Sequence, residues 1–326
     1  MTRKGLILHG VGGLYRVRLD DGTVIQCKAR GAFRHEGTTP LVGDAVCVAQ
    51  DGADALGDDA GAWITEILPR RNVLIRPAVA NLDVMFVVCA AREPEPSLRF
   101  LDQMLCILES QDILPILVVT KADLDMQRAA QLRVKYEKCG FTVFVTSQNT
   151  LTQDDAISAY IAERAGACHD FKAAFCGASG VGKSSLMNRL FPSLTLETGD
   201  LSEKIARGKH TTRAVSLFPI VEIQGPEQER LHGAVGYIAD TPGFSLLDFA
   251  RFDFFSLAEL AYTFREFRPY IGHCRYSGCT HTKEEGCAIL AAVSEKRIPK
   301  SRHTSYLCLY DALKEKERNA YHIQKK

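Results

Sequence analysis

Residues 172–191 read KAAFCGASGVGKSSLMNRLF. An apolar strand over Lys172–Cys176 is predicted to lead into a loop that fits the pattern G-x-x-x-x-G-K-S, and a helix is predicted over Ser185–Phe191. In that context the glycines let backbone N–H groups surround phosphates, and the helix N-terminus adds a positive dipole. A chance glycine-rich turn is the alternative, but the flanking strand and helix favour a nucleoside triphosphate-binding loop, or P-loop.

Each residue of this loop has an expected role. The Lys183 ammonium would reach the β- and γ-phosphates, and the Ser184 hydroxyl would ligate Mg²⁺. The other predicted nucleotide contacts are Gly177, Ala178, Ser179, Gly180, Val181, Gly182 and Ser185.

A second motif, Thr120-Lys121-Ala122-Asp123, follows an apolar strand and matches the N/T-K-x-D signature of GTPases. The Asp123 carboxylate can accept hydrogen bonds from guanine N1–H and the 2-amino group, whereas adenine would leave it unpaired. The Lys121 stem would lie along the base, Thr120 opens the motif, and Ser147 is placed to recognise guanine O6. A K-x-D sequence alone is common at helix N-termini, but beside a P-loop it predicts GTP.

Two further motifs are expected to sense the γ-phosphate. Asp240-Thr241-Pro242-Gly243 fits D-x-x-G, so Asp240 would hold Mg²⁺ through water and the Gly243 N–H would contact the γ-phosphate. The stretch Gly208-Lys209-His210-Thr211-Thr212 reads as switch I. One of its threonines, with Thr212 preferred, would complete the Mg²⁺ shell when GTP is bound.

The expected catalytic group is unusual. Many GTPases carry a water-orienting Gln just after D-x-x-G, but here that position is Phe244. Slow intrinsic hydrolysis is therefore expected. His210 is the candidate for orienting or activating water once a partner orders switch I; the alternative is an exposed loop histidine.

The motifs occur in a permuted order: TKAD, Ser147, P-loop, switch I and then DTPG. Ordinary GTPases begin with the P-loop and end with the base-recognition motifs. The order indicates a circular permutation, which keeps a site intact and moves the termini to exposed loops. DTPG then leads directly into the C-terminal region, so switch II movement would be coupled to whatever that region binds.

A metal site is predicted near the C-terminus. The ligand pattern is Cys274-x4-Cys279-x-His281-x5-Cys287. Three thiolates and one imidazole form a closed four-coordinate set, which is typical of structural rather than catalytic zinc. The other eight of the 11 cysteines, seven between Cys27 and Cys176 and then Cys308, are predicted to be buried free thiols.

The segments around these motifs predict an α/β protein of three domains. Residues 1–72 contain short alternating strands, typical of a small barrel such as an OB-fold. Residues 73–250 alternate apolar strands with helices, which predicts a parallel sheet carrying the circularly permuted P-loop GTPase domain. Residues 251–326 read as a mostly helical zinc-binding domain.

Composition agrees with a soluble cytoplasmic protein. Of the 326 residues, 46% are hydrophobic and 24% charged, which is ordinary for a globular chain. No signal peptide is indicated, and the apolar run Ile113–Val119 is too short to span a bilayer. The charge is not spread evenly along the chain: residues 77–250 carry −5 and residues 251–326 carry +5. A basic C-terminal region is compatible with a nucleic-acid partner.

Taken together, GASGVGKSS, Asn81-Leu82-Asp83, TKAD, G-x-H-T-T, DTPGF and the Cys3His pattern resemble the ribosome small-subunit-dependent GTPase family, RsgA/YjeQ. Lys209 departs from the Arg expected in G-R-H-T-T. The resemblance implies a late-stage assembly factor that binds the immature 30S subunit with GTP, hydrolyses it on stimulation by the subunit, and leaves. It also implies that the barrel and the zinc domain contact 16S rRNA. We expect a cytoplasmic, monomeric protein with no membrane partner.

Basic residues support an RNA partner from the sequence. In the barrel they accompany two aromatic residues, which suits an OB-fold nucleic-acid surface, although a solvated face is the alternative. These barrel residues are Arg16, Arg18, Lys28, Arg30 and Arg34, with Tyr15 and Phe33. Those flanking the zinc pattern are Arg275, Lys283, Lys296, Arg297, Lys300 and Arg302. Two other functions stay open: a non-catalytic RNA-binding module latched by GTP, and a P-loop ATPase or kinase acting on a small molecule.

Overall fold

The computed structural model describes residues 2–31, 33, 37–50, 61–75, 78–147, 153–168, 170–194, 215–223, 231, 235–240 and 254–324, with side chains omitted at 240 and 320–324. Contacts divide the chain into two compact units. Unit 1 contains residues 1–85, 154–176 and 183–244; unit 2 contains residues 86–153, 177–182 and 245–326. Each unit is described by itself. No helix among the described residues has both the length and the apolar character that crossing a bilayer requires.

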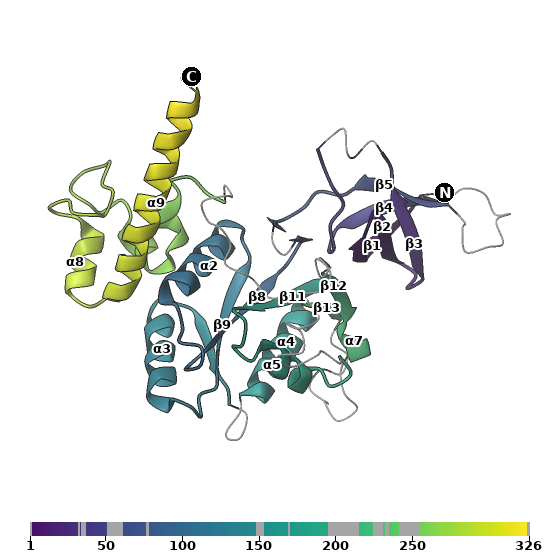
Figure 1. Ribbon diagram of the computed structural model, residues 1–326, viewed down its shortest axis with the longest axis horizontal. Helices are drawn as coiled ribbons and strands as arrows, with labels where there is room; N and C mark the ends of the chain where they lie inside the picture. Colours follow the sequence, from purple (N-terminus) through teal and green to yellow (C-terminus); the bar gives the residue numbers. More distant parts are fainter. Residues whose placement is uncertain are drawn as a thin grey trace, which may run out of the picture. The chain divides into compact units, whose positions relative to one another are not determined.

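Unit 1 begins with a closed five-stranded barrel, drawn in purple and blue in Figure 1. The strands follow the order β1-β2-β3-β5-β4, and antiparallel pairing of β4 with β1 closes the ring. This closure and the parallel β3–β5 pair give the OB-like topology that the alternating pattern predicts. The strands are β1 (Thr2–Val11), β2 (Leu14–Leu19), β3 (Val24–Ala29), β4 (Ala45–Gln50) and β5 (Ala62–Ile67).

Strands β1 and β2 pack closely, and the aromatic residues Tyr15 and Phe33 lie inside the barrel. A Cβ on Gly5 would lie 2.7 Å from the Arg18 carbonyl oxygen, so only glycine allows β1 and β2 to approach this closely. Tyr15 alternates inward on β2 and covers Gly10; like Phe33, it is only 8% exposed. The interpretation of Tyr15 and Phe33 as RNA-stacking residues is therefore wrong, because both rings belong to the barrel core.

The rest of unit 1 contains strands that extend from the barrel. Parallel β11 and β13 align from Phe171 opposite Gly236 to Ala174 opposite Ala239, and β12 pairs antiparallel with β13. His9 on β1 pairs with Ser216 on β12, and its Nδ1 lies 2.8 Å from the Ser216 hydroxyl. The elements are β6 (Val73–Leu74), β7 (Val79–Ala80), α4 (Asp154–Ala167), β11 (Phe171–Gly177), α5 (Lys183–Leu190), β12 (Ser216–Pro219), α7 (Ile220–Ile223) and β13 (Gly236–Asp240).

Unit 2 contains three strands in the order β10-β9-β8, with β9 and β10 parallel. Every residue of β8 is buried, as a continuously apolar strand predicts. Ser97 and Asp125 cap the two helices by accepting hydrogen bonds from backbone N–H groups three residues later. The elements are β8 (Val84–Ala90), α2 (Leu98–Ser110), β9 (Leu114–Thr120), α3 (Met126–Lys138) and β10 (Thr142–Val145).

The C-terminal part of unit 2 is helical, as predicted. It contains the 3₁₀ helices η2 (Leu260–Thr263) and η3 (Arg265–Tyr270), then α8 (Ala288–Ser294) and α9 (Lys300–Gln324). In Figure 1 the yellow helix α9 runs beside α2, and contacts between the two confirm this neighbourhood.

A buried ionic network joins α9 to the helices before it. The Arg302 guanidinium is fully buried and donates to Asp102 on α2 at 2.8 Å and to Glu266 on η3 at 2.6 Å. Hydroxyls of Tyr136, on α3, and Ser305 also donate to Asp102, at 2.8 and 2.5 Å. Arg302 is thus a structural residue, and its assignment as an RNA phosphate contact is wrong.

Most cysteines behave as predicted. Cys27, Cys47 and four others are buried and free, and burial raises the pKa of the Cys89, Cys106 and Cys176 thiols to about 12. Cys168 and Cys308 differ from the prediction, because both are only half-buried.

We expect Arg302→Met to lower the free energy of unfolding by about 3–5 kcal/mol, because two carboxylates would lose a buried cation. Loss of far-UV circular dichroism in guanidinium chloride measures this effect. The control is Arg297→Met, which removes an exposed arginine whose ion pair with Glu295 is solvent-accessible. Equal stability of the two variants would contradict a structural role for the network.

Candidate functional site

The base-recognition motif and the P-loop lie side by side. The Thr120 hydroxyl donates a hydrogen bond to the Val181 carbonyl oxygen at 2.5 Å and lies 3.2 Å from the Cys89 carbonyl oxygen. Thr120 is only 4% exposed, so this bond is sheltered from water. Two motifs separated by 61 residues in sequence are therefore held together at one edge of the fold.

The P-loop has a backbone that requires its glycines. Gly180 and Gly182 have φ values of +77° and +88°, a region that other residues rarely adopt. A Cβ on Gly177 would lie 2.4 Å from the Val88 carbonyl oxygen, so glycine is also needed where the loop leaves β11. Helix α5 begins at Lys183 directly after the loop. Strand, loop and helix therefore follow in the order that a phosphate-binding loop needs.

The TKAD segment presents its polar groups at the end of β9. Lys121 adopts a positive φ of +52°, and its ammonium donates to the Glu93 carbonyl oxygen. The Asp123 side chain is exposed, whereas Ser147 is buried at 5% exposure. The Ala122 N–H donates to the Thr146 carbonyl oxygen at 3.2 Å, which ties the motif to the segment that carries Ser147. An exposed carboxylate in a motif that is tied to the Ser147 segment suits an incoming purine edge.

Several predicted residues cannot be placed. His210, Thr212 and Gly243 lie outside the described residues, and the Asp240 side chain is not described. The backbone of Asp240 ends β13, which is parallel to β11. The carboxyl ends of these neighbouring strands therefore lie at the same edge, where β11 leads into the P-loop.

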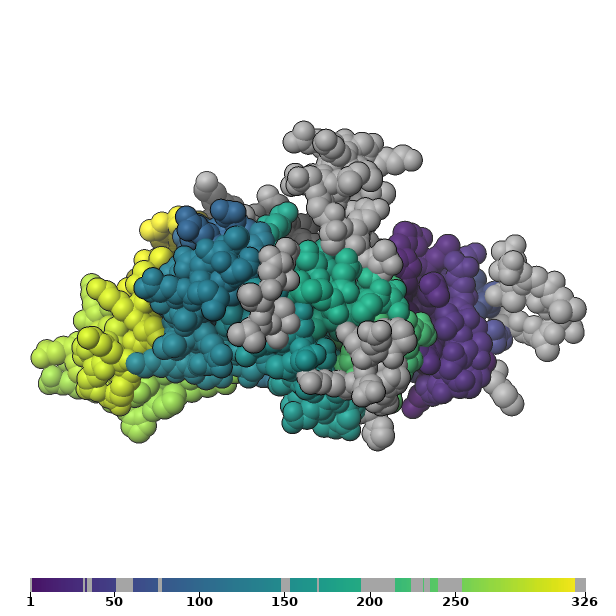
Figure 2. Space-filling model, turned by 90° about the horizontal axis from the view of Figure 1, so that it is seen from below, coloured from purple at the N-terminus to yellow at the C-terminus, as the bar shows by residue number. Residues whose placement is uncertain are grey.

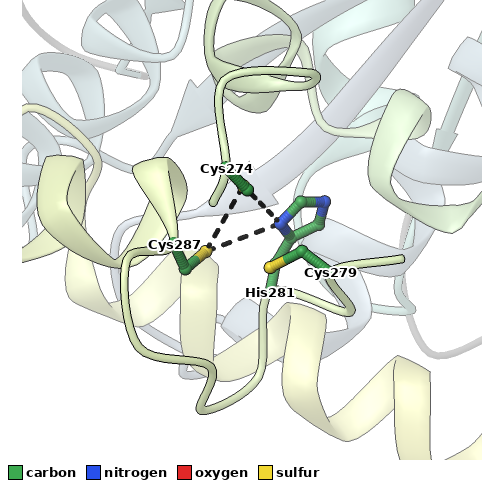
Figure 3. A group of neighbouring side chains, drawn as sticks. All are labelled: Cys274, Cys279, His281 and Cys287. Atoms are coloured by element: carbon green, nitrogen blue, oxygen red, sulfur yellow. Dashed lines mark hydrogen bonds between the residues drawn. The ribbon is translucent and has the colours of Figure 1, made fainter. Parts of the chain in front are cut away.

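The four predicted metal ligands converge in one cluster, shown in Figure 3. The Cys274 and Cys287 sulfurs lie 3.9 Å apart, and each is 3.5 Å from His281 Nδ1. All four donor atoms, including the Cys279 sulfur, lie within 4.8 Å of one another. A tetrahedral zinc ion separates two sulfur ligands by about 3.8 Å and sulfur from nitrogen by about 3.6 Å. The donor types and spacing therefore fit structural zinc.

Three residues that sequence reasoning did not identify hold the ligand loop. Glu284 accepts from the Thr280 N–H at 2.8 Å and the Thr282 N–H at 2.9 Å. Burial opposes ionisation of this carboxyl, but the hydrogen bonds outweigh it and lower the pKa of Glu284 to about 2. From α9, His303 donates to the His281 carbonyl oxygen at 2.8 Å, and Tyr306 donates to Thr280 at 2.7 Å. In the sequence, Glu284 lies midway between the ligands His281 and Cys287, and this position is the one signal from which its role could have been predicted.

We predict that Glu284→Ala weakens zinc binding about 10–100-fold, because its carboxylate orders the backbone between Cys279 and Cys287. Competition with a coloured zinc chelator measures the affinity. The matched control is Glu285→Ala, which changes an exposed neighbour. If the two variants retained zinc equally well, the carboxylate would have no part in forming the site.

Comparison with known proteins identifies the family. The family model described as RsgA GTPase matches residues 67–250, and the RsgA N-terminal domain model matches residues 4–55. A protein of Alkaliphilus metalliredigens named small ribosomal subunit biogenesis GTPase RsgA is 39% identical over 97% of this chain and 99% of its own. A Geobacillus thermodenitrificans protein of the same name is 38% identical over 96% and 98%.

Solved structures agree with these matches. YjeQ from Thermotoga maritima superposes with a TM-score of 0.74 at 27% identity, covering 96% of this chain and 99% of that one. YloQ, described as a circularly permuted GTPase, gives 0.70 at 30% identity, covering 97% and 96%. Circular permutation, which the motif order of this chain indicates, is thus also the description given to a solved structure that superposes on it. The chain belongs to the RsgA GTPase family and is a circularly permuted GTP hydrolase.

Proposed function

We propose that this GTPase acts late in assembly of the small (30S) ribosomal subunit, and that the subunit stimulates hydrolysis, which is coupled to release of the protein. The observation that carries the proposal is full-length likeness to relatives named small ribosomal subunit biogenesis GTPase. The Thr120–Val181 hydrogen bond supports the nucleotide-binding part of the proposal, because it holds the TKAD motif against the P-loop.

For nucleotide binding we propose that the P-loop backbone and Lys183 hold the phosphates, while Thr120, Lys121, Asp123 and Ser147 read guanine. Ser184, Thr212 and Asp240 would hold Mg²⁺, which neutralises charge that develops on the phosphates. Gly243 would contact the γ-phosphate, and His210 would orient the attacking water.

Three domains, 1–72, 73–250 and 251–326, would share the work, with the first and last contacting 16S rRNA. The exposed side chains Arg16 and Lys28 on the paired strands β2 and β3 support this for the barrel. In the zinc-binding part, the exposed Tyr276 ring lies under the Arg275 guanidinium, 5.6 Å from its centroid. An exposed aromatic ring with an adjacent cation suits stacking on an unpaired base. We propose that the protein works as a cytoplasmic monomer.

Purified 30S subunits should raise the rate of phosphate release from GTP, and His210→Ala should lower the stimulated rate about 10²-fold or more. The matched control is His273→Ala, an exposed histidine outside switch I. Stimulation absent from the wild-type protein would contradict the coupling and favour a GTP-latched RNA-binding module. Full stimulated turnover in His210→Ala would remove this histidine from the mechanism.

Asp123→Asn should exchange guanine for xanthine specificity. The Asn oxygen can still accept from N1–H, but its amino group faces the guanine 2-amino group and would instead donate to the xanthine 2-carbonyl. We expect GTP affinity to fall at least about 10²-fold and xanthosine triphosphate to bind better than GTP. Fluorescence titration with labelled nucleotides measures both. Unchanged preference for GTP would show that Asp123 does not read the base.

A further inference from the structure

A groove outside the nucleotide and metal sites lies between α3 and the segment that runs from α8 to the first residue of α9. It has a volume of about 990 Å³ and belongs entirely to unit 2. Figure 2 shows the blue surface that includes α3 adjoining the yellow surface of α9 on one face of the molecule. We call it the α3–α8 groove; Val134 on α3 and Leu290 and Val293 on α8 line it.

Helix α3 contributes a mixed outer face to this groove, in which apolar Ala130 and Val134 accompany Gln127 and Gln131. Its inner face is buried, as a helix packed on a sheet requires. Ala130 and Val134 are four residues apart, so they lie along the same side of the helix, and Val134 is 65% exposed. The buried residues of the inner face are Ala129, Leu132 and Tyr136.

The walls of the groove carry positive charge only. Lys135, Lys138, Lys296 and Lys300 line it, and no carboxylate is among its lining residues in the described parts of the chain. The nearest acidic residues in sequence are engaged elsewhere. Glu137 accepts from Arg133 at 2.7 Å, and Glu295 pairs with Arg297. The Lys138 ammonium donates to the Lys296 carbonyl oxygen, which leaves its charge without neutralisation by that contact.

The electrostatics of Lys135 agree with this imbalance. Burial lowers the pKa of Lys135, and the positive charge of Arg128 lowers it further, outweighing the opposite effect of Asp102. A carboxylate brought into the groove would favour the charged form of Lys135 and offset the repulsion from Arg128. The site therefore gains most from a ligand that combines apolar surface with negative charge.

We infer that the α3–α8 groove binds an acidic amphipathic helix of a protein partner. Apolar side chains of such a helix at positions i, i+4 and i+7 would cover Val134, Leu290 and Val293, and flanking carboxylates would meet the lysines. RNA fits less well, because aliphatic side chains line the groove and, among the residues that the structure describes, no aromatic ring lines it for a base to stack on. The inference is independent of the proposed action on the small subunit.

The probe is a fluorescein-labelled peptide of about 18 residues, which spans about 27 Å as a helix, with Leu at the anchor positions and Glu on both flanks. Fluorescence anisotropy with the full-length, zinc-loaded protein measures binding. We expect Lys135→Glu/Lys138→Glu and, separately, Val134→Asp to weaken binding at least about tenfold. Added salt should weaken it as well. Lys314→Glu, an exposed lysine on α9 outside the groove, is the control.

Exchanging the charges of peptide and protein shows whether a loss of binding comes from the lost charge or from misfolding of the variant. A second peptide with Lys in place of Glu should bind Lys135→Glu/Lys138→Glu better than it binds the wild-type protein. The inference is overturned if a scrambled peptide of equal composition binds as tightly, or if no binding occurs up to about 1 mM. It is also overturned if a single-stranded RNA of equal length displaces the peptide and loses affinity in Val134→Asp, since the groove would then take nucleic acid.

Discussion

One hydrogen bond, from the Thr120 hydroxyl to the Val181 carbonyl oxygen, holds the TKAD motif against the P-loop. A nucleotide bound by its base at one end and its phosphates at the other would span both motifs, so the two motifs must be positioned relative to each other before it binds. The bond is buried, and its loss would leave the Val181 carbonyl without this partner at a cost of about 1–3 kcal/mol. The contact joins a side chain and a loop that are 61 residues apart in sequence, so it does not depend on the two motifs being neighbours along the chain.

The part of the chain that carries the Cys3His cluster belongs to the same compact unit as this contact. Arg302 on α9 reaches Asp102 on α2, and Tyr136 on α3 donates to the same carboxylate. One cation faces two carboxylates here, so the hydroxyl donors are needed to satisfy the remaining acceptor capacity. Metal ligands, α9 and the helix that follows TKAD are consequently joined through buried polar groups. The C-terminal region is an integral part of the fold around the base-recognition motif rather than an appended module.

The sequence predicts well where local pattern decides structure. Apolar runs predict β8 and β9, capping residues agree with the starts of α2 and α3, and motif spacing predicts the metal cluster. It fails where tertiary context decides. Arg302 reads as a surface cation because a buried arginine needs partners more than 30 residues away in sequence, Glu266 and Asp102. Tyr15 reads as an exposed ring because alternation alone does not say which face of a strand closes a barrel. Only its position midway between His281 and Cys287 distinguishes Glu284 from its exposed neighbour Glu285.

The 13 residues of helix α3 take part in three structural features. It starts just after TKAD, its inner face packs on the sheet with Tyr136 in the Arg302 network, and its outer face lines the α3–α8 groove. Occupation of the groove could alter guanine recognition only by moving α3 relative to β9. Buried Leu132 and the Tyr136–Asp102 hydrogen bond both oppose that movement. A ligand in the groove should therefore tether the protein to its partner and leave nucleotide affinity unchanged, because a shift of the helix would cost both core packing and a buried hydrogen bond.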